Sequence, residues 1–257
     1  MSALPATLAS GRVLVRRALN EIVRVPAAGI PSMIAPSFFM LGTTAVFGHL
    51  TQLRGFPTDK YLEFVMPISM MQAAGFTGTA TGVNLARDIE HGWFDRMLLS
   101  PAPRILLIAA NVASAGIRSL LPVPFTLGVG FALGVRWPGL GALLVSIGLA
   151  MGFAVVAATW ASSMALYFRT QSAAPLFQTS VFVSVLFSTS YAPQSLLTGF
   201  LKDVARWNPV TKVVEGVRQG FVGDLAWTTT WHALAVLVGL ALVAGALALR
   251  NLARMGD

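Results

Sequence analysis

Hydrophobic residues occur in six long runs along the chain, separated by short polar segments. A helix needs roughly 20 mostly apolar residues to cross a bilayer, and only helices or a closed barrel satisfy their backbone hydrogen bonds there. The runs are too long for barrel strands, so the pattern predicts an all-α membrane protein with six transmembrane helices. These helices are expected at about 29–49, 61–83, 105–134, 139–166, 173–191 and 230–250.

Composition supports this fold class. Of the 257 residues, 55% are hydrophobic and only 11% are charged, and the mean hydropathy is +0.71. A soluble domain carries about twice that share of charge. The net charge is +8, and the basic residues that produce it flank the apolar runs without forming a long basic stretch. This distribution favours contact with lipid head groups over binding of nucleic acid. The chain has no cysteine, so disulfides and thiolate metal sites are excluded.

The distribution of basic residues indicates the orientation. An even number of spans places both ends of the chain on one side of the membrane. With the N-terminus inside, ten basic residues fall in cytoplasmic segments: Arg12, Arg16, Arg17, Arg24, Arg87, Arg96, Arg104, Arg169, Arg250 and Arg254. Seven fall in external segments: Arg54, Lys60, Arg136, Lys202, Arg206, Lys212 and Arg218. The bias favours cytoplasmic termini.

The segment before the first run has an amphipathic pattern. On a helical wheel its apolar residues fall on one side, while Arg16, Arg17 and Arg24 fall on the other, and Pro26 stops the pattern. This favours a helix lying along the inner membrane surface over residues 1–28. The alternative is a cleaved signal peptide, but that needs an apolar stretch directly after the arginines and small residues at its end.

Residues 87–104 place much charge between two apolar runs. A helix over 87–99 would carry an apolar half, including Trp93, and would end before Pro101 and Pro103. Its polar side could face a soluble partner. The alternative is a loop kept in water by its charge. The charged or titratable residues are Arg87, Asp88, Glu90, His91, Asp95 and Arg96.

Between the fifth and sixth runs, apolar residues recur at helical spacing over 196–204 and 210–221. Two short amphipathic helices are therefore expected, the second with Asn208 as N-cap and Pro209 as its first residue. Glu215 and Arg218, three positions apart, could pair there. The alternative is a surface hairpin without a role in transport.

The runs contain few groups for chemistry. Every Asp and Glu lies in a connecting segment or, for Glu63, at a span edge, which disfavours a proton-coupled carrier. Neither H-E-x-x-H nor G-x-S-x-G occurs, so an intramembrane enzyme of these types is also disfavoured. Arg118 lies deep in the third run, close to Pro122 and Pro124, which are expected to break that helix.

Two stripes of polar, small and aromatic residues could line a path for a bulky, largely apolar substrate. Such stripes also serve as contacts between helices, and that alternative stays open. The candidates are Gln72, Gly75 and Thr79 in the second run and Phe177, Ser180, Ser184, Ser188 and Tyr191 in the fifth.

The order of these parts resembles the ABC-2 family of ATP-binding-cassette exporter permeases, and most closely its daunorubicin-resistance branch. Two motifs carry the likeness. After the second run the family pattern is met by Glu90, Gly92, Arg96, Leu98, Leu99, Ser100 and Pro101. The later motif is met by Asn208, Pro209, Thr211, Glu215 and Arg218. Trp93-Phe94 and His91 depart from the common pattern.

The resemblance implies a permease of drug-like hydrophobic compounds in a bacterial cytoplasmic (inner) membrane, with a coupling helix at 87–96 that docks on an ATPase. No phosphate loop occurs in this sequence, so ATP and Mg²⁺ would be held by that separate subunit, and no cofactor or metal is expected on this chain. Six spans imply half an exporter, so two ATPases and a second permease copy or paralogue are expected.

The resemblance also implies that the external helices enter the outer leaflet part-way. The whole chain, 1–257, is then one domain: interfacial helix at 1–28, five spans in 29–191, external helices in 192–229, and the last span with a cytoplasmic tail in 230–257. Alternatives are an exporter of a lipid or lipid-linked glycan, an ATP-independent carrier, and a scaffold for a membrane enzyme.

Overall fold

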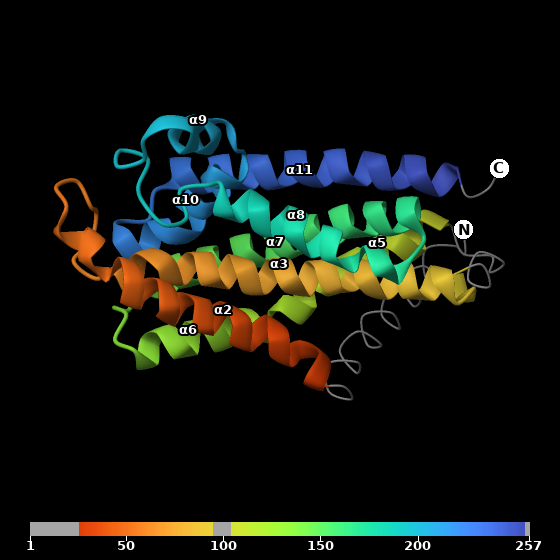
Figure 1. Cartoon of the computed structure of the whole chain (residues 1–257), viewed down its shortest axis with the longest axis horizontal. Helices are drawn as coiled ribbons and strands as arrows, with labels where there is room; N and C mark the ends of the chain where they lie inside the picture. The colour runs from red at the N-terminus through yellow and green to blue at the C-terminus, as the bar shows by residue number, and fades with distance from the viewer. Residues whose placement is uncertain (1–25, 95–103, 255–257) are drawn as a thin grey trace.

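A computed structural model describes residues 26–94 and 104–254, and all regular secondary structure in these ranges is helical. The long helices run side by side along the long axis of the molecule, and the connections gather at its two ends (Figure 1). The elements are α2 (Pro26–Phe47), η1 (Gly48–Gln52), α3 (Tyr61–Glu90), α5 (Arg104–Ser119), α6 (Pro122–Ala132), α7 (Leu140–Phe168), η2 (Gln171–Ala173), α8 (Ala174–Leu186), α9 (Gly199–Trp207), α10 (Val210–Val222) and α11 (Trp227–Ala253). The all-α prediction is confirmed for these residues. The expected interfacial helix before Pro26 lies outside them.

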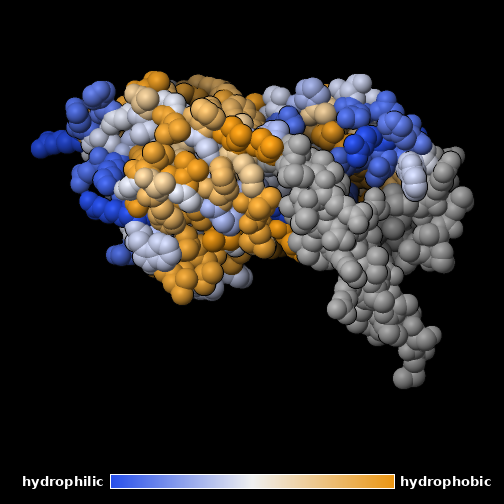
Figure 2. All heavy atoms as spheres, turned by 90° about the horizontal axis from the view of Figure 1, so that it is seen from below, coloured by the Kyte–Doolittle hydropathy of each residue, from blue (hydrophilic) through white to orange (hydrophobic). Residues whose placement is uncertain are grey.

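Four stretches of the described chain are long and apolar enough to cross a membrane: Ile30–Gln52, Ile108–Ala132, Leu140–Phe168 and Trp227–Ala253. They coincide with four of the six predicted spans. Figure 2 shows that the surface seen from below is apolar across the middle and hydrophilic toward both ends. The chain is therefore an integral membrane protein. The other two predicted spans correspond to α3 and α8, which do not meet the same criteria.

Helix α3 lies at the centre of the molecule, where it contacts α2, α5, α6, α7, α8 and α10. Its 30 residues are about 45 Å long, which is more than enough to cross a bilayer. Its polar residues lower the hydropathy, but several bond within the helix, as Thr77 does to the Ala73 carbonyl (2.9 Å). A helix covered by protein does not need a fully apolar surface, so α3 can cross without the expected hydropathy signal.

Glycines on α3 allow a close approach to α7. A Cβ atom added to Gly78 would lie 2.8 Å from the Ala157 Cβ and 2.9 Å from the Ala158 nitrogen. At Gly82 the added atom would collide with Ala161. Small residues on both helices therefore bring the two backbones together, as in other membrane helix pairs.

Two predictions about helix ends have different outcomes. The third span is broken as predicted, because α5 ends at Ser119 and α6 begins at Pro122. The fifth was predicted to continue to residue 191, but α8 ends at Leu186. The Ser188 hydroxyl donates to the Val185 carbonyl (2.6 Å), and Ser190 bonds to the same oxygen. These side chains compete with the backbone amides and end the helix early.

Candidate functional site

The predicted coupling segment begins as part of α3, not as a separate helix. Arg87, Asp88 and Glu90 form the last turn of α3, and the His91 amide closes it on the Arg87 carbonyl (3.0 Å). Gly92 follows with φ +70°, a left-handed conformation that glycine adopts easily and that ends helices. The expected single helix over 87–99 is therefore interrupted at His91 and Gly92, and helical backbone resumes at Trp93 and Phe94. Asp95 and Arg96 lie outside the described residues.

Contacts at this end tie the segment to its neighbours. The Glu90 carboxylate accepts a hydrogen bond from the Gln171 amide (2.8 Å), which links the end of α3 to η2 at the start of α8. His91 bonds through Nδ1 to the Arg87 carbonyl (2.8 Å). Trp93, which was predicted to lie on the apolar half of this helix, is 61% exposed, whereas Phe94 is 1% exposed and lies in the core. Phe94, which follows the turn, therefore anchors this segment to the core.

The ends of α7 and α11 meet at the same end of the molecule. Asn251 donates from Nδ2 to the Ser163 carbonyl (2.9 Å), and the Arg169 guanidinium donates to the Arg254 carbonyl (3.4 Å). Arg169 ends α7 in a left-handed conformation, φ 57°. Together with the Glu90 bond, these contacts join α3, α7, α8 and α11 into one connected charged end.

At the opposite end, Arg218 of α10 is buried, with 7% of its surface exposed. It donates to the carbonyls of Phe64 (3.1 Å), Thr189 (2.6 Å) and Ser190 (3.3 Å), and its guanidinium lies 3.6 Å from the centre of the Phe64 ring. Removal from water lowers its pKa, yet an arginine stays protonated at neutral pH. One side chain thus holds α10 against α3 and the segment after α8.

The predicted pairing of Glu215 with Arg218 is wrong. Glu215 instead pairs with Lys212, one turn earlier on the exposed side of α10 (2.9 Å). Both spacings are three residues, so the local pattern did not distinguish them. Arg218 faces the interior, where backbone carbonyls replace the carboxylate.

The other residues of the late motif form the joint between α9 and α10. Both predicted amphipathic helices are present, although α10 begins at Val210, one residue later than expected. Asn208 still accepts from the Val210 amide (3.0 Å), and its own amide donates to the Ser184 carbonyl of α8 (2.7 Å). Pro209 precedes the helix, and Thr211 donates to the Ala205 carbonyl of α9 (2.7 Å). The motif therefore fixes α8, α9 and α10 together.

The two candidate substrate stripes lie within helix packing in the single chain. Thr79 and Phe177 are fully buried, and a Cβ at Gly75 would lie 3.1 Å from Val181 and 3.2 Å from Phe153. Ser180 accepts from the Trp160 indole (2.9 Å) and donates to the Phe177 carbonyl (2.9 Å).

The remaining stripe residues are likewise in contact with neighbouring helices or backbone. Ser184 and Ser188 bond within their own helix or its end, and Gln72 is 4% exposed. Tyr191 accepts at its carbonyl from the Tyr61 hydroxyl (3.0 Å). The observed role of the stripes is packing, and their contact with substrate stays a prediction.

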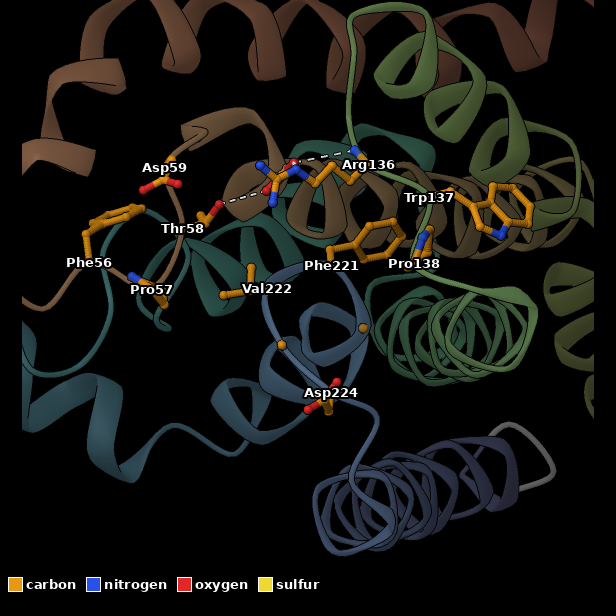
Figure 3. Close-up of a pocket in the computed structure, with 13 residues that line it drawn as sticks. Phe56, Pro57, Thr58, Asp59, Arg136, Trp137, Pro138, Phe221, Val222 and Asp224 are labelled. Carbon is orange, nitrogen blue, oxygen red and sulfur yellow. Dashed lines mark hydrogen bonds and ion pairs between the residues drawn. The ribbon is translucent and has the colours of Figure 1, made fainter.

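A cavity of about 470 Å³ opens at the end that carries α10 (Figure 3). Sequence reasoning missed it, because its walls come from three segments far apart in the chain. These are the loop before α3 with Glu63, the α6–α7 connection, and the end of α10 with the following loop. The lining residues are Phe56, Pro57, Thr58, Asp59, Glu63, Arg136, Trp137, Pro138, Gly220, Phe221, Val222, Gly223 and Asp224.

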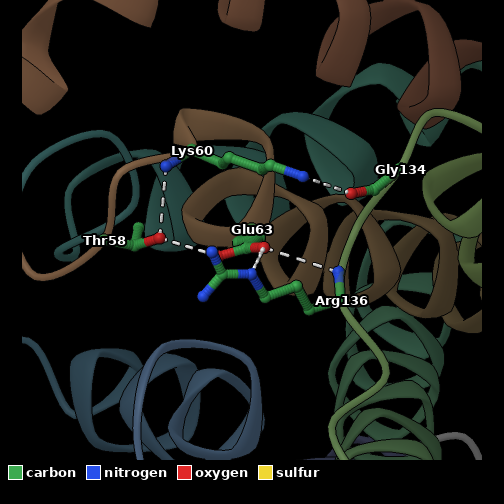
Figure 4. Close-up of polar contacts among 5 residues, drawn as sticks. All are labelled: Thr58, Lys60, Glu63, Gly134 and Arg136. Carbon is green, nitrogen blue, oxygen red and sulfur yellow. Dashed lines mark hydrogen bonds and ion pairs between the residues drawn. The ribbon is translucent and has the colours of Figure 1, made fainter.

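A polar network holds the cavity together (Figure 4). Glu63 is 3% exposed, accepts from the Thr58 hydroxyl (2.7 Å) and the Arg136 amide (3.4 Å), and lies 3.7 Å from the Arg136 guanidinium. The Lys60 ammonium donates to the Gly134 carbonyl (2.9 Å). The start of α3 is therefore fixed to the α6–α7 connection.

Comparison with known proteins gives a consistent result. The sequence profile of the family described as ABC-2 type transporter matches residues 10–222. The chain is 24% identical to a probable doxorubicin resistance ABC transporter permease protein of Mycobacterium tuberculosis, over 86% of this chain and 81% of that protein. It is 26% identical to a daunorubicin resistance ABC transporter permease protein of Streptomyces coeruleorubidus, over 91% and 82% respectively. A putative transport permease of Cyanophora paradoxa is 25% identical, over 80% and 72%.

Proposed function

The chain belongs to the ABC-2 type transporter family, and we propose that it is the permease subunit of an ATP-driven exporter that moves hydrophobic or amphiphilic, drug-like compounds out of a bacterial cell. The observation that carries this proposal is the likeness, over most of the chain, to permeases named for doxorubicin and daunorubicin resistance. The membrane-spanning helices and the apolar surface between polar ends agree with such a role.

The energy source is a separate ATPase, because these 257 residues contain no phosphate-binding loop. The ATPase docks at the charged end formed by the last turn of α3 and the residues that follow. Two observations support this surface. Arg87 and Glu90 are exposed there, and the buried Phe94 and the Glu90 bond to Gln171 connect the segment to α3 and α8. A push on this segment is then transmitted to both helices.

The topology follows from the same surface. Helix α3 also crosses the membrane, and η2, α8 and the segment up to Tyr191 together make one more crossing, which gives six in all. The charged end faces the cytoplasm. The start of α2 and the end of α11 lie toward one end of the molecule, as an even number of crossings requires (Figure 1). Large apolar side chains such as Phe38 and Leu242, each 69% exposed, face lipid or a second permease copy. Two permeases, identical or paralogous, then work with two ATPases in the cytoplasmic membrane.

The test is expression of this chain together with a candidate ABC ATPase that carries a phosphate-binding loop. The two should purify together in mild detergent, and Asp88→Lys should lose the ATPase while inserting normally. Asp203→Lys makes the same charge change on α9 at the opposite end and should keep the complex. Repeated purification without an ATPase would contradict the proposal. A complex that moves a fluorescent lipid but no drug-like dye would make the substrate a lipid.

A further inference from the structure

We infer that three arginines at the charged end, Arg169, Arg250 and Arg254, bind the head group of an anionic phospholipid in the adjoining leaflet. They form one basic site where the ends of α7 and α11 meet. The inference goes beyond the proposed function, because lipid binding is a property of the permease alone. It does not depend on an ATPase or on the compound that is exported.

The three arginines lie at the depth of lipid head groups. Arg169 directly follows the span Leu140–Phe168, and Arg254 directly follows the span Trp227–Ala253. Arg250 lies one helical turn before Arg254, on the same face of α11. An arginine at the end of a span can reach the lipid phosphates while the stem of its side chain stays beside acyl chains. The site therefore lies where an anionic lipid presents its charge.

The positive charges are not neutralised within the described chain. All three side chains are exposed, and no ion pair is found for any of them among residues 26–94 and 104–254. The Glu90 carboxylate accepts from the Gln171 amide, two positions after Arg169, but forms no ion pair with Arg169. Like charges held close together repel one another, so an external anion stabilises this arrangement.

The backbone at Arg169 adopts a conformation that disfavours a side chain. Its φ of 57° is left-handed, and no other residue except glycine has a positive φ among those described. Glycine is the usual residue at this position of a helix end, because other residues are strained there. Arg169 nevertheless reaches across to α11 and donates to the Arg254 carbonyl (3.4 Å). This contact places two arginines side by side and leaves the other N–H donors of Arg169 for a ligand.

The surroundings favour a lipid over a soluble partner. Tyr167 is 63% exposed, Phe168 is 40% exposed and Leu249 is 43% exposed, and they directly precede Arg169 and Arg250 in the chain. Exposed apolar side chains at the end of a span face acyl chains, and tyrosine is common at the boundary with the head groups. A basic site beside an apolar surface matches a phospholipid, in which phosphate and acyl chains belong to one molecule.

The test uses the full-length permease, purified without an ATPase in a neutral detergent. Native mass spectrometry measures the lipids that stay bound from an equimolar mixture of phosphatidylglycerol and phosphatidylcholine with the same acyl chains. Wild type should prefer phosphatidylglycerol about tenfold, because each arginine near the head group adds to the attraction. The triple variant Arg169→Gln, Arg250→Gln, Arg254→Gln should reduce this preference to about twofold or less.

The control is the triple variant Arg54→Gln, Lys202→Gln, Arg206→Gln. It removes the same charge from exposed positions at the opposite end of the molecule (Figure 1) and should keep the wild-type preference. Equal losses in the two triple variants would overturn the site, because net charge alone would then explain the binding. Equal binding of the two lipids to wild type would overturn it as well.

Arg169→Gly distinguishes lipid binding from a structural role of this arginine. Glycine adopts the left-handed conformation without strain, so in neutral detergent the variant should melt no lower than wild type does. Added phosphatidylglycerol should raise the melting temperature of wild type, because it binds the folded protein, and should raise that of the variant clearly less. A variant that is less stable without lipid, but gains as much from the lipid as wild type, would refute the role of Arg169.

Two further outcomes would identify a different partner. Inorganic phosphate that stabilises wild type as much as phosphatidylglycerol does would make this a site for a soluble anion. An Arg169, Arg250 and Arg254 triple variant that keeps the wild-type lipid preference, but no longer purifies with an ATPase, would make it a protein interface. Either result would overturn the lipid site.

Discussion

Arg218 offers the sharpest test of how the external end is held together. Arg218→Met keeps much of the side-chain length but removes the guanidinium that donates to the carbonyls of Phe64, Thr189 and Ser190. A hydrogen bond from a charged donor contributes about 1.5–3 kcal/mol. Three such bonds represent about 4.5–9 kcal/mol. Removing the buried charge also removes its desolvation penalty, which offsets a large part of that sum. The expected net loss in the free energy of unfolding is about 2–3 kcal/mol.

For a protein of this size such a loss lowers the melting temperature by about 5–10 °C. The measurement is thermal unfolding of the detergent-solubilised permease, followed by loss of the monodisperse peak. Arg218→Lys should recover only part of the stability, because an ammonium on a flexible stem cannot reproduce the fork that reaches three carbonyls.

The control for this prediction is Arg206→Met, which removes the same group from an exposed position on α9 and should melt as wild type does. An Arg218→Met protein that melts within about 2 °C of wild type would refute the role of Arg218. Equal shifts in the two variants would refute it as well, since a general effect of lost charge would then suffice.

Three further predictions concern packing, exposure and coupling. Gly78→Ala should cost about 1–3 kcal/mol in thermal unfolding because its methyl group meets the α7 backbone, whereas Gly148→Ala on α7, with open space around it, should leave the melting temperature near that of wild type. A single cysteine at Lys212 should react with an impermeant thiol reagent added outside the cell, while one at the buried Val214 should not; labelling only from the cytoplasm would reverse the topology. Glu90→Ala should lower dye efflux per ATP hydrolysed by about half or more with little loss of stability, since one exposed hydrogen bond contributes about 1 kcal/mol or less, and Glu90→Gln, which retains an acceptor oxygen, should recover part of it.

The parts of the fold that depend on local pattern could be predicted from the sequence. Long apolar runs predicted the positions of α2, α7 and α11. Pro122 and Pro124 predicted the break between α5 and α6. The family resemblance is confirmed by the match over residues 10–222. Helix positions and helix breaks follow from local hydropathy and from proline, and both affect the backbone at their own positions in the sequence.

Features that depend on distant partners could not be predicted in the same way. Arg218 finds the Phe64 carbonyl 154 residues away, so its spacing to Glu215 pointed to the wrong partner. The cavity likewise combines three separate segments, and no local motif marks it. The start of the coupling segment differed because Gly92 turns the chain before Phe94 packs into the core. In each case a tertiary contact outweighed a local pattern.

The central claim is that ATP hydrolysis on a partner drives export through this chain. Its most direct test is efflux of a hydrophobic dye from proteoliposomes that contain the permease and its ATPase. The account predicts that efflux persists when an uncoupler collapses the proton gradient, and that it stops when the phosphate-loop lysine of the ATPase is replaced. Efflux that the uncoupler abolishes and that is indifferent to that lysine would contradict the account and leave an ATP-independent carrier in its place.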